Sequence, residues 1–381
     1  MDVSDLSTKA QCRKDVVSLM NREFPRGEPQ SHALPFDEEF AALLTDNDPS
    51  RILFAYESDE NPVPLAALAW KSFTLKQGLK IAALGLVVTD SAQRKRGLSR
   101  RLILEAETRA HSEGCALMCL WSDLLDFYTK LGYVLAGSEI SWDLSDLPDI
   151  EELAVSENFS ESVFRNATLD DIPAMLECYA HETIGPERDT RPLKRQLAQS
   201  DSLSLLATHD GRTRAYALAG KGRDLRNVIH ELIGDSKYFP ALLERMRKKL
   251  VAQNASMPVR LQFPASHPLR TDIESLFAAG EQGAVCFAKV LRIEDLIAAF
   301  NAELASQGFD SLRIRYLADI SAWTLEDGKQ DIFMSPDPAH LIQVFCQPWE
   351  LEELEGLPGR TLKRLNDWRP YPLYFWGPDG V

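Results

Sequence analysis

The sequence has few cysteines and no long apolar segment, and each shortage excludes a class of protein. Its six cysteines include no Cys-x-x-Cys pair, so we expect reduced, buried thiols and no disulfide framework. The longest wholly apolar run, "IAALGLVV" at residues 81–88, is far shorter than the ~20 residues that cross a bilayer. The N-terminal stretch "MDVSDLSTKAQ" lacks the apolar core of a secretion signal. These features predict a cytoplasmic protein without membrane contact.

Positive charge is also scarce. The chain has 42 Lys and Arg against 57 Asp and Glu, which gives a formal net charge of -15. Binding to DNA or RNA needs a positive surface, so we expect no nucleic-acid partner. An acidic surface would instead attract a cationic substrate. The length of 381 residues exceeds one ordinary core and predicts two or three domains.

The apolar patterns predict the same order of elements twice along the chain. In the first half, helices precede three strands, and a helix, a strand, a helix and a strand follow; the ranges are 8–24, 35–44, 51–58, 63–75, 79–88, 97–114, 115–121, 124–132 and 133–144. Residues from about 296 predict a small α+β module with an aromatic tail, "YPLYFWGPDGV", pinned in a groove. We therefore expect an α/β fold with mixed (α+β) sheets, divided into a first domain, a linker, a second domain and a C-terminal module at residues 1–146, 147–161, 162–293 and 294–381.

One basic stretch, "SAQRKRGLSRRL" at residues 91–102, stands out in this acidic chain. It follows a buried strand and opens a helix, where free backbone N–H groups and the helix dipole attract anions. Gly97 would let the backbone approach a phosphate closely. The alternative is a solvated charged face on the helix, which we expect for Arg100 and Arg101.

A second motif, "FYTKLGY", places Tyr128 31 residues after Gly97. Together with Arg94-x-x-Gly97-x-Ser99 it resembles the GCN5-related N-acetyltransferase (GNAT) superfamily over about residues 10–144. The resemblance implies a V-splayed mixed sheet and acetyl-CoA as cosubstrate. It implies an N-acetyltransferase that moves the acetyl group to a primary amine of a small molecule or peptide by direct attack. The alternative is a non-catalytic acyl-CoA-binding or regulatory protein.

The resemblance also assigns roles to individual residues. Backbone groups of Val87 and Val88 would bind the pantetheine arm, and Tyr128 would protonate the departing thiolate as general acid. The backbone N–H groups that would bind the pyrophosphate belong to Arg94, Lys95, Arg96, Gly97, Leu98 and Ser99. Three features depart from the family: Ser99 replaces Gly or Ala, Trp121 replaces a common Asn, and the usual first strand is weak or missing.

The general base is left open, because the strand before the loop, "AALGLVV", carries no acid. Asp123 and Glu139 are candidates. The domain order resembles, more narrowly, the enhanced-intracellular-survival (Eis) type, which has tandem GNAT domains and a sterol-carrier-like C-terminal module. That resemblance implies that the C-terminal carboxylate of Val381 acts as base and that a homo-oligomer forms.

The second half repeats the element order without the chemistry of the first. Its loop, "IGDSKYFPALL", lacks the Arg-x-x-Gly-x-Gly pattern, so we expect a degenerate copy that binds no acyl-CoA. His230 and Glu231 do not form a His-Glu-x-x-His motif, so we expect no metal site. Glu231 is instead a candidate to line a substrate cleft.

Overall fold

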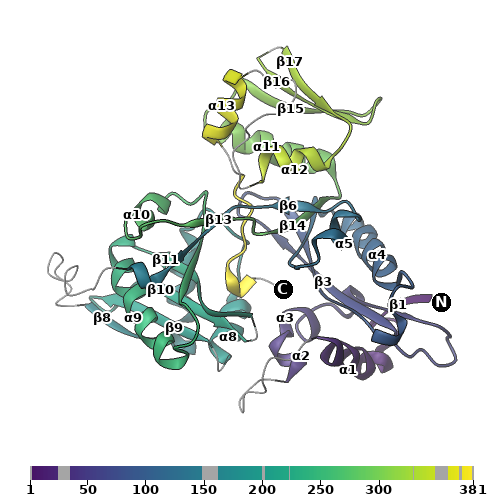
Figure 1. Ribbon diagram of the computed structural model, residues 1–381, viewed down its shortest axis with the longest axis horizontal. Helices are drawn as coiled ribbons and strands as arrows, with labels where there is room; N and C mark the ends of the chain where they lie inside the picture. Colours follow the sequence, from purple (N-terminus) through teal and green to yellow (C-terminus); the bar gives the residue numbers. More distant parts are fainter. Residues whose placement is uncertain are drawn as a thin grey trace.

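The computed structural model describes residues 2–24, 35–147, 162–199, 202–222, 224–328, 330–347, 359–368 and 371–379. Within these residues the strands form two seven-stranded mixed sheets and one three-stranded sheet, each in its own lobe (Figure 1). The mixed α/β class predicted from the sequence is confirmed. None of the helices in the described ranges is long and apolar enough to cross a membrane. All six cysteines are free thiols.

The first sheet has the order β1-β2-β3-β4-β5-β14-β6. Its strands are β1 (Asp2–Asp5), β2 (Ile52–Tyr56), β3 (Ala66–Thr74), β4 (Lys80–Thr89), β5 (Leu117–Leu120), β6 (Val134–Ala136) and β14 (Cys286–Val290). One face packs on α4 (Leu98–Ser112), and the other packs on α1 (Arg13–Glu23) with two short helices, α2 (Phe36–Glu39) and α3 (Ala41–Leu44). β1 pairs with β2 over its whole length, so the expectation of a missing first strand was wrong.

The second sheet has the order β13-β7-β12-β11-β10-β9-β8. Its strands are β7 (Glu139–Asp143), β8 (Ser162–Asn166), β9 (Leu203–His209), β10 (Arg212–Lys221), β11 (Asp224–Gly234), β12 (Arg260–Pro264) and β13 (Glu281–Gly283). Its helices are α7 (Ile172–Ala180), α8 (Thr190–Ala198), α9 (Phe239–Gln253) and α10 (Arg270–Glu274). The repeated element order predicted from the sequence is thus present as a second sheet with its own helices.

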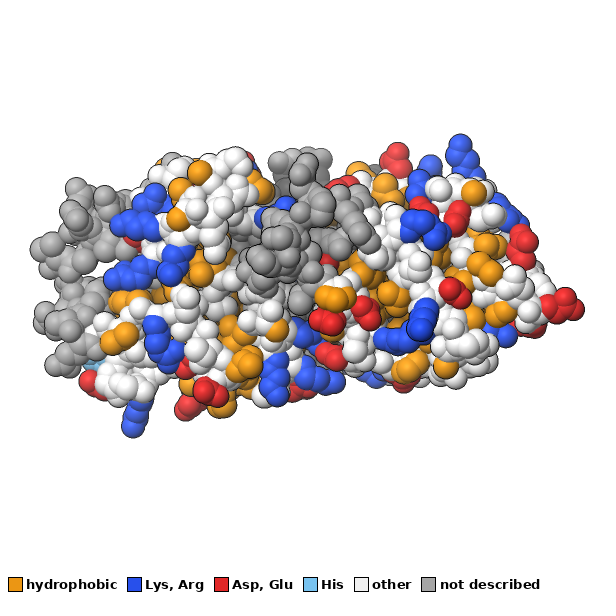
Figure 2. Space-filling model, turned by 90° about the horizontal axis from the view of Figure 1, so that it is seen from below, with side chains coloured by type: hydrophobic (Ala, Val, Ile, Leu, Met, Phe, Trp, Pro, Cys, Tyr) orange, Lys and Arg blue, Asp and Glu red, His pale blue; other side chains and the backbone are white. Residues whose placement is uncertain are grey.

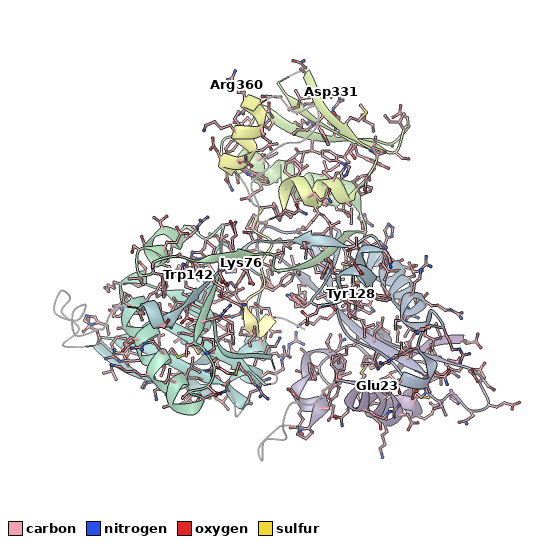
Figure 3. All side chains as sticks on the ribbon, viewed as in Figure 1. Glu23, Lys76, Tyr128, Trp142, Asp331 and Arg360 are labelled. Carbon is pink, nitrogen blue, oxygen red and sulfur yellow. The ribbon has the colours of Figure 1, made fainter. Side chains whose placement is uncertain are left out.

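The two large sheets exchange strands. The single strand expected over residues 133–144 is broken at Gly137, whose φ of +74° turns the chain, and a Cβ there would lie 2.6 Å from the carbonyl oxygen of Leu373. After the turn, β7 lies between β12 and β13 of the second sheet, and β14 in return lies between β5 and β6 of the first. Trp142 therefore lies in the lobe of the second sheet although Tyr128 lies in that of the first (Figure 3). The expected division at residues 147–161 stays a prediction, because 148–161 lie outside the described residues.

The third lobe is the small C-terminal α+β module. Strands β15 (Leu312–Leu317), β16 (Ala322–Asp327) and β17 (Gln330–Ser335) form an antiparallel sheet with α11 (Ile293–Ser306), α12 (Ala339–Phe345) and α13 (Gly359–Trp368). The last of these helices was not predicted from the sequence. The likeness of the C-terminal module to sterol carrier proteins stays a prediction. From this lobe the C-terminal tail, residues 371–379, runs down between the two larger lobes (Figure 1).

Candidate active site

The first sheet splits between its two central parallel strands. β4 and β5 pair in register from Ile81 and Leu117 up to Leu84 and Leu120, where β5 ends. β4 continues to Thr89, with a bulge at Leu86, whose φ is +54°. The final residues of β4 therefore have no parallel neighbour on this side. Val87 and Val88 lie in this stretch, where backbone groups can pair with an extended ligand.

The loop after β4 is shaped as an anion cradle. The Asp90 carboxylate caps a short 3-10 turn by accepting from the N–H of Ala92, and two residues with positive φ follow, Lys95 (+66°) and Gly97 (+76°). Gly97 is the N-cap of α4 and supplies no side-chain cap. The first N–H groups of the helix have no acceptor within the helix, so they are available to an anion at the end of the split.

The cations of the loop are balanced by nearby acids. Arg94 donates to Glu23 at 2.9 Å, and Arg96 donates to Glu57 at 3.0 Å. Figure 2 shows Lys and Arg side chains interspersed with Asp and Glu across the face seen from below. The basic stretch that stands out in the sequence is therefore partly neutralised in three dimensions, and the backbone cradle is its more specific feature.

Ser99, the position that departs from the family pattern, has a local structural partner. Its hydroxyl lies 2.5 Å from the hydroxyl of Thr89, the last residue of β4. This hydrogen bond ties the first turn of α4 to the end of the strand. The serine hydroxyl therefore fixes the cradle's shape even if it never contacts a phosphate.

We expect Ser99→Ala to lower the free energy of unfolding by about 1 kcal/mol, the net value of one such hydrogen bond. The dissociation constant for acetyl-CoA should stay within about threefold, since the backbone N–H groups remain. Thermal unfolding and calorimetric titration of the same preparations measure both quantities. A tenfold weaker acetyl-CoA affinity with unchanged stability would instead mean that the hydroxyl binds the ligand directly.

Tyr128 lies on α5 (Leu125–Thr129) and is 5% exposed. Its ring packs against Tyr133 and against Phe287 of the exchanged strand β14, with centroid distances of 5.8 and 6.0 Å. Burial raises the pKa of Tyr128 to about 12, and a hydrogen bond with Ser122 acts in the opposite direction. The hydroxyl is therefore protonated throughout the neutral range, as a general acid must be.

The three candidate bases have different surroundings. Asp123 is exposed, just after β5. Glu139, the first residue of β7, is largely buried, and burial raises its pKa to about 7. Val381 lies outside the described residues, so its proposed role is not tested by the structure.

An aromatic cluster that the sequence did not reveal lies on the face of the first sheet opposite α4. Phe375 of the tail packs against Phe73 of β3 at 5.9 Å and edge-on against Trp121 at 5.0 Å. Lys71, two residues before Phe73 on the same strand, places its ammonium 4.3 Å from the Phe73 ring centroid. The only sequence signal for Lys71 was one charged residue inside an apolar strand, "LAALAWKSF".

The tail is anchored by a buried ion-pair network. Arg188 binds Glu231 with two hydrogen bonds of 2.8 and 2.9 Å, and its Nε donates to Asp379 at 2.9 Å. Tyr216 donates a further hydrogen bond of 2.6 Å to Glu231. The expectation that Glu231 lines a substrate cleft was wrong, because its carboxylate is fully engaged in holding Arg188.

The same tail occupies the split of the second sheet. β11 and β12 pair in parallel at Val228–Arg260 and Ile229–Leu261. Beyond this point Trp376 packs edge-on against Phe263 of β12 at 5.7 Å, and Gly377 lies so close to His230 of β11 that a Cβ would be 2.1 Å from its ring nitrogen. The split of the second sheet is thus filled by the tail.

Comparisons with known proteins agree with this geometry. Residues 8–136 match the family described as "Acetyltransferase (GNAT) domain". No curated protein sequence matches the chain. Among solved structures, a GCN5-related N-acetyltransferase from Anabaena variabilis is similar over 100% of both chains, with a TM-score of 0.63 and 11% identity.

Two further structures have similar folds. A probable N-acyltransferase from Enterococcus faecalis covers 97% of both chains with a TM-score of 0.63 and 12% identity. An Eis protein from Mycobacterium abscessus is similar over 78% of this chain and 76% of the Eis chain, with a TM-score of 0.50 and 14% identity. At such identities the likeness concerns the fold.

Proposed function

We propose that this chain, which carries a GNAT acetyltransferase domain over residues 8–136, transfers an acetyl group from acetyl-CoA to a primary amine of a small molecule or peptide. The observation that carries the proposal is the split between β4 and β5, which opens onto the cradle at the start of α4 and has Tyr128 nearby. Acetyl-CoA supplies the activated thioester. The chain's own residues hold it and move the protons.

The residues have separate tasks in this proposal. The backbone of Val87 and Val88 holds the pantetheine arm in the split, and the N–H groups from Arg94 to Ser99 hold the pyrophosphate. The amine nitrogen attacks the thioester carbonyl carbon, and the C–S bond of the tetrahedral intermediate then breaks. Tyr128 gives its proton to the departing thiolate. A base removes the extra proton from the nitrogen.

Among the three candidate bases, the structure favours Glu139. A base of pKa near 7 accepts a proton at neutral pH and can release it again, and burial gives Glu139 such a pKa. The side chain interacts electrostatically with Cys286 and with Tyr374 of the tail. Cys286 is in turn hydrogen-bonded to Cys119 of β5, which pairs with Ala83 of β4.

Glu139→Gln should lower kcat/KM by about 100-fold, the lower range for loss of a general base. With a pKa of about 7, Glu139 is the ionised base above pH 7, so kcat/KM of the parent should rise through pH 7 to a plateau. The variant should lose this rise. Release of CoA, followed from pH 5.5 to 9, measures the profile.

Asp123→Asn is the matched control, because Asp123 is an exposed carboxylate just after β5, and kcat/KM of this variant should change less than threefold. A Glu139→Gln variant with parental rate and pH profile would remove Glu139 from the mechanism. Removal of Gly380 and Val381 tests the remaining candidate in the same assay.

The alternative function is a non-catalytic acyl-CoA-binding or regulatory protein. Calorimetric titration with acetyl-CoA, followed by CoA release with polyamines, aminoglycosides and lysine peptides, separates the two functions. Turnover of any amine supports the transferase, and tight binding without turnover of any amine supports the alternative. We also propose a cytoplasmic location and a homo-oligomer. Light scattering of the purified chain tests the oligomeric state.

A further inference from the structure

Lys71 is a half-buried cation in the lobe of the first sheet. It lies in the middle of β3, where its side chain is on the face opposite α4. Within the described ranges no carboxylate lies within ion-pair distance of its ammonium, which is instead placed over the ring of Phe73. An ammonium that is partly removed from water and has no counter-ion costs free energy.

The charges that surround Lys71 are mostly positive. Arg195 and Arg191 of α8 and Lys221 of β10 all repel its ammonium, whereas Asp379 of the tail attracts it. Asp379 is already bound to Arg188, and Arg195 is paired with Asp46 at 2.7 Å. Burial, with these neighbours, lowers the pKa of Lys71 to about 7. Among these groups the cations outnumber the acid, although the chain as a whole carries a charge of -15.

The position of Lys71 relates it to the split. In the sheet it lies opposite Ala83 of β4, which pairs in turn with Cys119 of β5. One or two strand spacings, about 5–10 Å, therefore separate its backbone from the start of the split. Ala83 and Gly85 are its neighbours on this face of β4, and these small residues project little above the sheet.

We propose that Lys71 binds an anionic group of the acceptor, so that the substrates of this chain are amines that also carry a carboxylate a few bonds from the nitrogen. The proposal rests on the acetyl transfer proposed above. A carboxylate supplies the missing counter-ion, and a charge-assisted hydrogen bond to it holds the amine toward the thioester. This class differs from the cationic substrates that the overall acidity predicts.

Matched acceptors test the proposal in the full-length protein. γ-Aminobutyrate and its primary amide differ only in the carboxylate, as do longer and shorter ω-amino acids and their amides. The parent protein should use the acid with kcat/KM about 10- to 100-fold above that of the amide, the effect of one charge-assisted hydrogen bond. Lys71→Met should lower kcat/KM for the acid to the value for the amide and leave kcat/KM for the amide unchanged. Lys71→Arg should keep part of the preference.

Lys14→Met is the matched control, since Lys14 is an exposed lysine on α1. This variant should leave kcat/KM for both acceptors unchanged. A circular dichroism spectrum like that of the parent shows that Lys71→Met is folded. Equal use of acid and amide by the parent would overturn the role of Lys71 while leaving acetyl transfer intact.

A binding assay keeps this proposal separate from the transferase activity. N-Acetyl-γ-aminobutyrate and its amide resemble the products, and their affinity for the CoA-loaded protein is measured by calorimetry without turnover. Tighter binding of the acid that disappears in Lys71→Met supports the site even if no amine is acetylated. Equal or undetectable binding of the two compounds, together with equal turnover, rejects it.

Discussion

Tyr128→Phe is expected to lose 100-fold or more in kcat while binding acetyl-CoA as tightly as the parent. Phenylalanine keeps the ring that packs against Tyr133 and Phe287 but removes the proton that the thiolate needs. Because burial raises the pKa of Tyr128 to about 12, the parental hydroxyl is protonated at every pH of a normal assay. The loss should therefore be the same at pH 6 and pH 9. Single-turnover release of CoA measures it.

Tyr133→Phe is the matched control for this substitution. Tyr133 is a neighbouring buried tyrosine, but its hydroxyl donates to Glu107 at 2.9 Å. Its loss should lower stability and leave kcat within about threefold, since that hydroxyl is already engaged. If Tyr128→Phe kept the parental kcat, the proton would have to come from another group, and the assignment of Tyr128 would be withdrawn.

The local features of the site could be predicted from the sequence because each depends on a short segment. A positive φ at Gly97 and a helix that begins at Leu98 follow from a glycine before an amphipathic pattern. Tyr128 is recognised by a motif within one short helix and the turn after it. The order of β2, β3 and β4 follows from neighbouring strands that pair in sequence.

The partner sheet of a strand could not be predicted in this way. Apolar alternation over 133–144 identifies an extended segment, but it does not say that the chain turns at Gly137 and crosses to the other sheet. The same holds for β14, whose Phe287 contacts Tyr128 from 159 positions further along the chain. The environment of the proposed acid is therefore built by residues that no local pattern connects to it.

The local charge around Lys71 could not be predicted from the sequence either. A net charge is a sum over the whole surface, whereas the field at one site depends on the few groups around it. The negative sum suggested a cationic substrate, but Lys71 is surrounded mainly by Arg191, Arg195 and Lys221. These residues belong to strands and helices of both large sheets, so only the assembled structure brings them together.

The largest loss of stability is expected for Arg188→Met. Arg188 and Glu231 are both 0% exposed, and Arg188 lies 3.8 Å from the ring centroid of Tyr179. Burial alone would lower the pKa of Arg188, but the carboxylates of Asp379 and Glu231 outweigh it and hold that pKa well above its usual value. Removing the cation leaves the buried carboxylates of Glu231 and Asp379 without a counter-ion. This should cost about 3–5 kcal/mol and lower the melting temperature by on the order of 10 °C.

The control variants separate the network from charge in general. Arg191→Met removes an exposed arginine of the same segment, paired with Asp189, and should change the free energy of unfolding by less than about 0.5 kcal/mol. Arg188→Met combined with Glu231→Leu and Asp379→Asn should recover much of the stability, because no uncompensated charge is left in the core. Since Asp379 holds the tail that places Phe375 against Phe73 and Trp121, both Arg188 variants should still lose acceptor affinity. A parental melting temperature for Arg188→Met would mean that the tail is held by its buried aromatic side chains alone.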